Sequence, residues 1–311
     1  MCIRDRYFSF GHDEEVGGSG AALITAKLKE EGVQLHWSLG EGSFVNKGFF
    51  PGIDKFVAPI NVAEKGSANL MIVAKAKGGH SSTPPQRTAV TILAEALVKL
   101  EKEPLPGSLE GLSAAMFNEV SKHMPFGYRF LFANRWLFGG VLDSQLSSTP
   151  IINAMIRTTT APTMLSGSVK SNVLPIEATA LINFRLHPRD TTESVTDHVR
   201  RVVGSNDVEV RFLEGREASE ISSWDSPGFK IISSSLEKVY GQIVSVPGLM
   251  IAASDTRHYS QVADNSFRFN PFSIVPEDMT GIHGTNESID IDSFIAGIKT
   301  YVEIIKEGST N

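Results

Sequence analysis

Two adjacent carboxylates, Glu14 and Glu15, are the residues in this sequence whose type and spacing could do chemistry. They follow an apolar, β-prone run that ends at Phe10, and they precede the small residues 17–20 that open an amphipathic helix. One carboxylate of such a pair can hold a metal ion while the other accepts and passes on a proton. The same pair could instead be acidic residues stabilised by the dipole of the following helix. The pattern alone leaves both interpretations open.

The elements that must position this pair are predicted to be a strand over residues 7–11, a helix over residues 20–30 and a strand over residues 33–39. This order is a βαβ crossover, which implies a largely parallel sheet with its functional residues at the carboxyl ends of the strands. Glu41 follows the second strand. We therefore expect Glu41 and the acidic pair to converge on one ion.

The composition limits what such a site could be. The chain has 311 residues, of which 41% are hydrophobic and 21% charged, as is typical of a globular protein. Its net charge of -6 and its lack of a basic cluster argue against nucleic acid as a partner. The single cysteine, Cys2, excludes an intrachain disulfide and a thiolate zinc site, so any metal must be held by His, Asp and Glu. No apolar run approaches the ~20 residues that a membrane-spanning helix requires.

The middle of the chain follows a different pattern. A strand is predicted over residues 68–76 and a helix over residues 89–103, with a turn-rich loop between them. Further strands are predicted over residues 166–173, 178–187 and 208–213, with a helix over residues 191–203. This order of elements indicates a small α+β sandwich inserted into the first domain.

Helix and strand alternation resumes after an acidic, Ser-rich linker at residues 214–225. Elements are predicted over residues 228–240, 244–252, 267–275 and 290–306. We predict an α/β fold with a mostly parallel sheet flanked by helices, interrupted by the inserted sandwich. The domain bounds are 1–65 for the first part of the main domain, 66–213 for the insert and 214–311 for the second part.

Two aromatic-rich helical stretches, residues 109–123 and 128–138, fall inside the predicted insert. They could line an apolar pocket, or they could be core of the insert. The helical spacing of their apolar residues favours core.

A series of motifs along the chain resembles the co-catalytic zinc aminoacylase/carboxypeptidase family, with the carboxypeptidase S-like branch as the best fit. The motifs occur in the order found in that family: HDEEVGG at 12–18, LGEG at 39–42, GGHSSTP at 78–84, SNVLP at 171–175, NFRLHP at 183–188, SDTRHY at 254–259 and HGTNE at 283–287. The resemblance covers nearly the whole chain from Tyr7.

For the acidic residues the resemblance implies distinct roles. Glu14 matches the general base, which takes a proton from a zinc-bound water and passes it to the leaving nitrogen. Glu15 matches a zinc ligand, and His283 matches the histidine that shares that ion. Glu41 matches the carboxylate ligand of a second zinc. This ligand set agrees with the exclusion of thiolates.

The inserted domain resembles the lid and dimerisation module of the family, which implies a homodimer. His80 matches a histidine that reaches the partner subunit's active site and could stabilise an oxyanion there. Asn172 matches a second lid contact, and Arg185 a substrate-binding arginine. Arg257 matches the arginine that grips the free carboxylate of a small peptide or N-acyl amino acid substrate. Each could instead be structural, as a turn residue, a cap or a member of an ion pair.

The chain also departs from the family pattern. Members of the family begin with a longer segment that carries a His-x-Asp ligand motif and an aspartate bridging the two zinc ions, and Gly40 replaces an acidic residue often found before the equivalent of Glu41. Here only six residues precede the first predicted strand. We therefore expect an N-terminally truncated chain, without a targeting region and with reduced or no activity. The alternative is a non-catalytic dimerising or amino-acid-binding homologue that has lost its metals.

Overall fold

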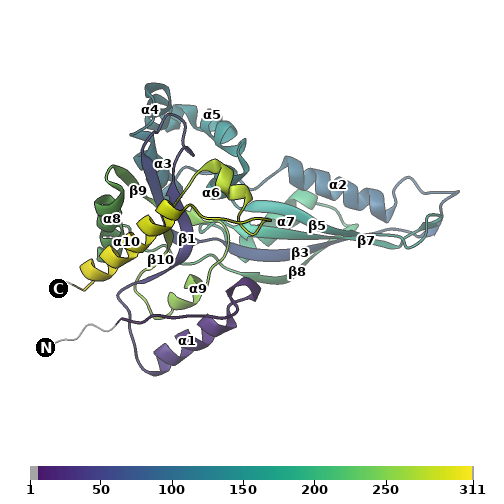
Figure 1. Ribbon diagram of the computed structural model, residues 1–311. Helices are drawn as coiled ribbons and strands as arrows, with labels where there is room; N and C mark the ends of the chain where they lie inside the picture. The colour runs from purple at the N-terminus through teal and green to yellow at the C-terminus, as the bar shows by residue number, and fades with distance from the viewer. Residues whose placement is uncertain (1–5, 310–311) are drawn as a thin grey trace. The chain divides into compact units, whose positions relative to one another are not determined.

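The computed structural model describes residues 6–309 of the chain (Figure 1). Cys2, on which the exclusion of a disulfide rested, lies outside these residues. The contacts between residues divide the described chain into two units. The first unit comprises residues 6–64, 109–145 and 219–309, and the second comprises residues 65–108 and 146–218.

The first unit is built on a four-stranded sheet. Its order is β1 (Ser38–Asn46), β10 (Ser266–Ile274), β2 (Phe56–Glu64) and β9 (Ile243–Met250). The long ladders β1–β10 and β2–β9 are parallel, while β10 and β2 are antiparallel. Apolar residues occupy almost every position of β2, because a strand buried on both faces has no solvent side to alternate with. The expected mostly parallel sheet is confirmed.

Nine helical segments complete the described part of the first unit. They are η1 (Glu14–Val16), α1 (Ser19–Glu30), α3 (Gly111–Ser121), α4 (Phe126–Ala133), α5 (Arg135–Ser147), α8 (Pro227–Tyr240), α9 (Thr256–Tyr259), η2 (Pro276–Thr280) and α10 (Ile291–Glu307). Among them α3, α8, α9 and α10 contact the sheet. The core joins side chains of the sheet to one face each of α3, α8 and α10, with Leu112, Ile232 and Ile304 as examples. Burial of these faces supplies most of the hydrophobic stabilisation of the unit.

The second unit contains an antiparallel sheet. Its order is β5 (Thr159–Ser166), β7 (Glu177–Leu186), β3 (Gly66–Lys75) and β8 (Val208–Arg216). Residues of β7 alternate between buried and partly exposed positions, as expected of a sheet with one covered face. The ladder between β3 and β7 runs from Gly66 opposite Leu186 to Lys75 opposite Glu177 without a bulge.

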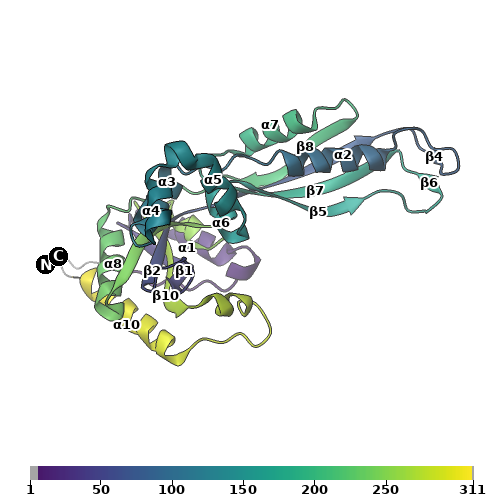
Figure 2. The same ribbon diagram turned by 90° about the horizontal axis from the view of Figure 1, so that it is seen from above.

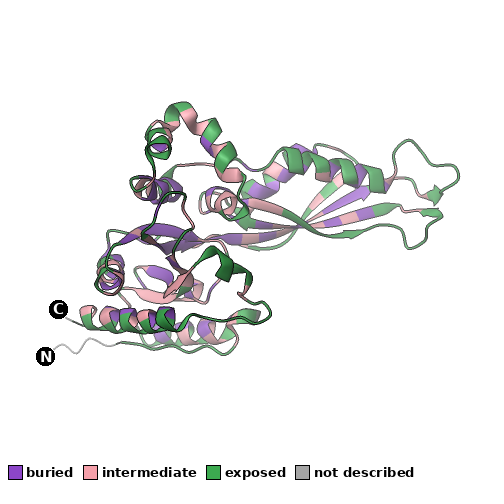
Figure 3. Ribbon diagram, turned by 45° about the horizontal axis from the view of Figure 1, so that its top comes forward, coloured by how far each residue is buried: buried purple, intermediate pink, exposed green. Residues whose placement is uncertain are grey.

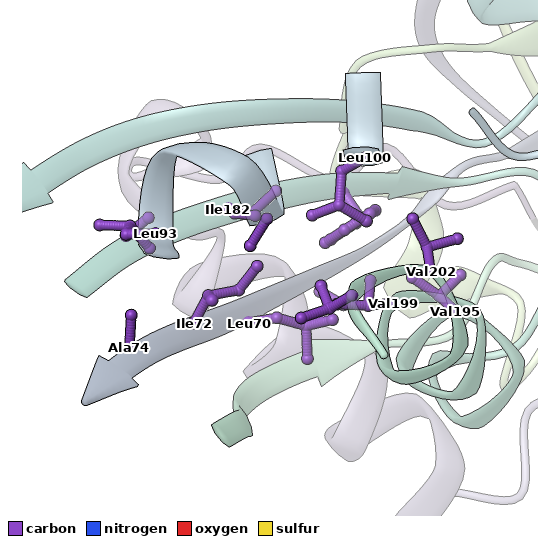
Figure 4. Packing of buried hydrophobic residues seen from close by; sticks show 14 of the residues in the cluster. Leu70, Ile72, Ala74, Leu93, Leu100, Ile182, Val195, Val199 and Val202 are labelled. Atoms are coloured by element: carbon purple, nitrogen blue, oxygen red, sulfur yellow. The ribbon is translucent and has the colours of Figure 1, made fainter. Parts of the chain in front are cut away.

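Two helices, α2 (Ala89–Lys102) and α7 (Thr192–Val203), cover one face of this sheet (Figures 1 and 2). Leu93 and Leu100 of α2 and Val199 of α7 pack against Leu70 and the neighbouring apolar residues of β3 and β7 (Figure 4). The unit also contains α6 (Pro150–Ile156) and a short antiparallel pair of β4 (Gly79–His80) and β6 (Val173–Leu174). The predicted α+β sandwich is confirmed.

The first predicted strand is absent from the structure. Residues 7–11 are irregular, and Phe8 and Phe10 are 69% and 85% exposed. A β-prone run forms a strand only when a neighbouring strand accepts its backbone hydrogen bonds, and β1 is paired with β10 and β2. The βαβ crossover was therefore wrong in its first strand, and its second strand begins at Ser38 instead of residue 33.

The boundaries of the inserted unit also differ from the prediction. Residues 109–145 were expected in the insert, but they belong to the first unit, where Leu112 of α3 joins the core beside β9.

Of the two aromatic stretches that were interpreted as core, the first is core: α3 buries Met116, Phe117 and Val120, but in the first unit and not in the insert. The interpretation was wrong for the second stretch. In α4 and α5 only Phe132 and Leu142 are buried, and Figure 3 shows most of both helices as exposed or intermediate.

Three further elements were missed or displaced. The sequence analysis did not predict β2 or α6, and it placed a strand over residues 166–173 where β5 has already ended at Ser166. The loop after β5 is therefore longer than expected and leads into the two residues of β6.

Candidate active site

The turn that carries the acidic pair is ordered by Asp13. Its carboxylate accepts hydrogen bonds from the backbone N–H groups of Ser19 and Gly20, each at 2.9 Å, and from the Ser19 hydroxyl. The hydrogen bond from the Ser19 side chain is the main reason why the pKa of Asp13 lies below its usual value. Asp13 thus caps the first turn of α1 from a position six residues upstream and closes the chain between them into a loop.

Glu14 lies in a cluster of carboxylates. Partial burial, followed by the charge of Glu41 and a hydrogen bond to it, raises the pKa of Glu14 to about 7, with smaller contributions from Glu15 and Asp255. A neighbouring negative charge disfavours the ionised form of Glu14 and so acts in the same direction as burial. The structure therefore places Glu14 and Glu41 beside each other.

A β-bulge aims Glu41 at this cluster. The register between β1 and β10 passes from Gly40 opposite Arg268 to Ser43 opposite Phe269, so residues of β1 are left unpaired between them. A Cβ atom at Gly42 would lie 2.2 Å from the Arg268 carbonyl oxygen, so only glycine allows the strands to approach this closely. Glu41 itself is exposed.

Asp255 is a member of the cluster that the sequence analysis missed. Its charge contributes to the raised pKa of Glu14, and its Oδ1 atom is buried with no hydrogen-bond partner among the described residues. The signal was present, because Asp255 belongs to the same SDTRHY motif that identified Arg257.

Arg257 faces the acidic turn. Its guanidinium donates to the Gly17 carbonyl at 2.9 Å and to the Ser254 carbonyl at 3.3 Å. A guanidinium has five N–H donors, so these two contacts leave others available for a ligand.

A buried ion pair lies behind this segment. Glu64 at the end of β2 and Arg268 in β10 are each fully buried, with Nε of Arg268 3.4 Å from Oε2 of Glu64. The Ser254 hydroxyl donates to the same Glu64 oxygen at 3.3 Å. Two strands of the sheet are thereby tied to the chain that carries Asp255 and Arg257.

The predicted metal ligands are not all gathered at one point. His283 is exposed in the loop after η2, and its φ of 56° places it in the left-handed region. Within residues 6–309 there is no group of three or more His, Cys, Asp or Glu side chains arranged to hold a metal ion. A zinc site normally uses at least three protein ligands, so Glu15, Glu41 and His283 do not by themselves fit a complete zinc site.

The second unit places two of the predicted residues side by side. His80 in β4 pairs with Val173 of β6, and the Ser81 N–H donates to the Asn172 carbonyl at 3.1 Å. The Nδ1 atom of His80 accepts from the Ser82 N–H at 3.2 Å and lies 2.8 Å from the Ser82 hydroxyl. An accepting Nδ1 leaves the proton of the neutral ring on Nε2.

Arg185 lies elsewhere in the same unit. It is exposed in the middle strand β7, opposite Ser67 of β3 and Thr159 of β5. Its charge is one of the influences on Lys65, whose pKa is lowered to about 7 mainly by burial. Lys65 donates to the carbonyl oxygens of Ala154 and Arg157.

Comparison with known proteins gives this geometry a context. Residues 62–211 match the family model of the peptidase dimerisation domain. The chain is 37% identical over 316 residues to the N-fatty-acyl-amino acid synthase/hydrolase PM20D1 of Mus musculus, covering 99% of this chain and 62% of that protein. It is 36% identical over 307 residues to the probable carboxypeptidase S-like 2 of Dictyostelium discoideum, covering 97% of this chain and 59% of that protein.

Solved structures agree on the fold. A metallo-carboxypeptidase of the M20 family from Sulfolobus solfataricus superposes with a TM-score of 0.61 at 18% identity, covering 94% of this chain and 68% of that one. Human carnosine dipeptidase 1 superposes with a TM-score of 0.55 at 16% identity, covering 96% and 64%.

The chain is therefore similar over nearly its whole length to proteins of the M20 family of metallopeptidases, which generally use zinc, and residues 62–211 match a peptidase dimerisation domain. Within that family it is similar to the carboxypeptidase S-like proteins and the N-fatty-acyl-amino acid synthase/hydrolases, as the motifs indicated. It spans about three fifths of the length of these relatives, 62% and 59% in the two cases above. No helix in residues 6–309 is long and apolar enough to cross a membrane.

Proposed function

We propose that this chain is part of an enzyme that hydrolyses an amide bond next to a free carboxylate, as a carboxypeptidase or an N-acyl-amino-acid hydrolase. The observation that carries the proposal is the cluster that Glu14, on the turn faced by Arg257, forms with Glu41 of β1. An acid–base group with a pKa near neutrality stands there beside a cation suited to a carboxylate.

In this proposal Glu14 is the general base. With a pKa of about 7 it can both accept a proton from the attacking water and return it to the leaving nitrogen at neutral pH. Arg257 would bind the carboxylate of the substrate with its remaining donors and so orient the amide bond.

The second unit would contribute to binding and to transition-state stabilisation in a homodimer, which the family match to a dimerisation domain supports. The proton on Nε2 of His80 is a suitable donor for the oxyanion of a tetrahedral intermediate, because Ser82 occupies Nδ1. Asn172 and Arg185 are assigned to substrate binding.

Zinc is the proposed cofactor, with two ions in a full-length subunit and with Glu15, Glu41 and His283 among the ligands. Bound zinc would supply an acidified water molecule for attack on the amide. A complete site would need donors beyond those gathered in the described residues, so we propose that this chain alone has reduced or no activity.

The substrate class is proposed from the relatives and from α4 and α5. The named relatives include N-fatty-acyl-amino acid synthase/hydrolases. Large apolar side chains of α4 and α5 are solvent-exposed, and Phe126 and Trp136 are 78% and 82% exposed. We propose that this surface favours an apolar acyl group or side chain on the substrate. A Trp136→Ser variant should then lose more activity on long-chain than on short-chain N-acyl amino acids, and an equal loss on both would contradict the assignment.

The main experiment compares hydrolysis of an N-acyl amino acid, a dipeptide and the amide-capped form of each, in the presence of zinc. Each substrate is assayed with this chain. Glu14→Gln should abolish turnover while leaving bound zinc unchanged, whereas Glu31→Gln on the exposed end of α1 is the matched control. Retained turnover in Glu14→Gln, or equal rates on free and capped carboxylates, would contradict the proposal.

A second candidate is a non-catalytic dimerising or amino-acid-binding homologue. The lack of a three-ligand group in residues 6–309 favours it. It predicts that the protein binds amino acids without stoichiometric zinc and without turnover. Zinc analysis of the purified protein separates it from the first candidate.

A further inference from the structure

We infer that the segment Asp255, Arg257 and Tyr259 is a clasp that holds the turn of Glu14 and Glu15 in position. The inference builds on the proposed function only in taking Glu14 as the base, and it assigns Asp255 and Arg257 as positioning residues.

The clasp contacts the acidic segment, residues 9–18, at successive points along the chain. The Tyr259 hydroxyl hydrogen-bonds the Ser9 hydroxyl upstream of the turn. The Arg257 guanidinium donates to the Gly17 carbonyl at 2.9 Å downstream of it. Asp255 stands between these contacts, because Cβ atoms built on Gly11 and Gly18 would lie 3.0 Å and 1.9 Å from its carboxylate oxygens.

Apart from the hydrogen bonds that Asp13 accepts from Ser19 and Gly20, the turn is short and contains flexible residues. It is a single turn of 3-10 helix, residues 14–16, with no side-chain hydrogen bond at its N-cap. Gly17 and Gly18 follow with φ values of 127° and 67°. Glycines in such conformations give up more backbone freedom than other residues when they are fixed, so the position of Glu14 depends on contacts from outside the turn.

The carboxylate of Asp255 can lie this close to the turn only because residue 18 is a glycine. A methyl group at this position would overlap Oδ1 of Asp255, which is buried and has no hydrogen-bond partner among residues 6–309. A carboxylate oxygen can approach the backbone this closely only where no side chain stands in its way.

The clasp is in turn attached to the sheet. Ser254, the residue before Asp255, is fully buried and donates to Glu64, which pairs with Arg268. The Ser254 carbonyl accepts a second hydrogen bond from Arg257 itself. The base-bearing turn is therefore connected through side chains to β2 and β10, the strands at the centre of the unit.

Arg257 therefore has a structural role in addition to its proposed role in binding the substrate carboxylate. Two of its donors already serve backbone carbonyls, so its removal should disturb the turn as well as any bound carboxylate. A residue that only grips substrate would affect KM when it is removed, whereas a positioning residue affects kcat.

Hydrogen exchange tests the clasp without any need for turnover. The N–H groups of Gly17 and Gly18 donate to Glu14 and Asp13 within the turn and report on its opening. Arg257→Ala should speed exchange of these two amides roughly five- to tenfold, the change expected from one lost hydrogen bond, while amides of β2 and β9 keep their protection. Arg257→Lys should restore part of the protection, and Arg200→Ala on α7 is the control. Unchanged exchange at Gly17 and Gly18 in Arg257→Ala would overturn the inference.

A pair of glycines isolates the contribution of Asp255. Gly32 has a φ of 69°, close to that of Gly18, but a Cβ atom there would meet nothing within 4 Å. Gly32→Ala therefore measures the backbone cost alone, and Gly18→Ala should speed exchange of the turn further than this control does. The double variant Gly18→Ala, Asp255→Ala should be no worse than Gly18→Ala alone, because the overlap is gone. Equal effects at Gly18 and Gly32 would show that Asp255 does not constrain the turn.

Steady-state kinetics separates the clasp from the proposed function. If Arg257 positions the base, Arg257→Ala lowers kcat on amide-capped as well as free substrates. A rise in KM confined to free carboxylates, with unchanged exchange in the turn, would leave the proposed hydrolysis intact and overturn the clasp. Accelerated exchange in a protein without turnover would retain the clasp and overturn the proposed hydrolysis.

Discussion

Different interactions stabilise the sheet of the second unit and the acidic segment of the first unit. In the second unit β3 pairs residue by residue with β7, and its inner face is covered by apolar side chains that are almost fully buried (Figure 4). The acidic segment has a single 3-10 turn, exposed aromatic residues upstream and a bulged strand beside it. Hydrogen bonds and charges, rather than apolar packing, fix its side chains.

The difference shows where stability and chemistry reside in this chain. Apolar burial gives the second unit a core of hydrophobic side chains packed between its sheet and two helices. In and beside the acidic segment, the carboxylates of Glu14, Glu15 and Glu41 lie close together, and their mutual repulsion lowers the stability of the fold. Substitutions in the two regions should accordingly differ in the size and kind of their effects.

The largest effect is expected in the core of the second unit. Phe184 in β7 is fully buried within the apolar cluster, so Phe184→Ala should lower the free energy of unfolding by about 4 kcal/mol through lost burial and a residual cavity. Phe10→Ala, at an 85% exposed position of the acidic segment, is the matched control and should change it little. Chemical denaturation measures both, and similar losses would remove the contrast.

The buried ion pair of the first unit tests whether a polar contact can contribute as much to the free energy of unfolding as apolar burial does. Glu64→Gln should cost roughly 3 kcal/mol, because it leaves the fully buried Arg268 without its carboxylate partner. Glu303→Gln, which removes a surface partner of Lys306, should leave the unfolding free energy near that of the parent chain. Denaturant titration measures the free energy of unfolding of both variants. A small loss in Glu64→Gln would show that the apolar core, and not the ion pair, stabilises this unit.

His187 makes the stability of the second unit depend on pH. Burial, followed by the charges of Arg189 and Lys65, lowers its pKa to about 3 from a usual value near 6.5. Below pH 6.5 the unfolded chain binds a proton that the folded chain does not, so this contribution to stability is complete above pH 6.5 and falls by up to about 1.4 kcal/mol per pH unit towards pH 3.

The variant His187→Asn should therefore show a shallower loss of stability than the parent chain between pH 6 and pH 4, with the difference measured by denaturation at each pH. Parallel curves would mean that His187 takes up its proton in the folded state. The carboxylates of the acidic segment are common to both chains and cancel in this comparison.

The smallest effect is expected at the helix starts. Thr191 caps α7 in a reciprocal pair of hydrogen bonds with Ser194, and Thr191→Ala should cost about 1 kcal/mol while Thr191→Ser costs much less. In the acidic segment Asp13→Ala should instead act locally and speed exchange of the Ser19 and Gly20 amides that Asp13 binds. A global loss of stability in the Asp13 variant, equal to that of Thr191→Ala, would contradict the local role.

Much of the fold could be predicted because regular elements have regular patterns. The helices α2, α7, α8 and α10 and the strand β7 lie within a few residues of their predicted places, since apolar residues recur on one face of each. The mostly parallel sheet and the inserted α+β unit followed from the order of these elements.

The predictions that were wrong share a physical cause, which is that they depend on contacts between residues distant in the sequence. Whether residues 7–11 form a strand depends on a neighbour that the local sequence does not contain, and whether 109–145 join one unit or the other depends on contacts distant in the sequence. For the site, the βαβ crossover predicted that Glu14 and Glu41 would meet at the ends of two strands, and they are neighbours although the first of those strands is absent. The sequence analysis did not reveal Asp13 and Asp255, whose roles depend on backbone geometry. The placing of Glu15 and His283 around a metal stays a prediction.

The strand β3 has a consequence for how the second unit assembles. It lies between β7 and β8, and its first residue, Gly66, stands opposite Leu186 and its second, Ser67, opposite Arg216. Neither ladder can form until long stretches of the chain, including the α4 and α5 excursion, have been synthesised and looped out. Such long-range pairing slows folding, because the entropy of closing large loops is lost before any contact compensates for it. We expect the helices α2 and α7 to form early and the central strand to be inserted late, in the rate-limiting step of folding.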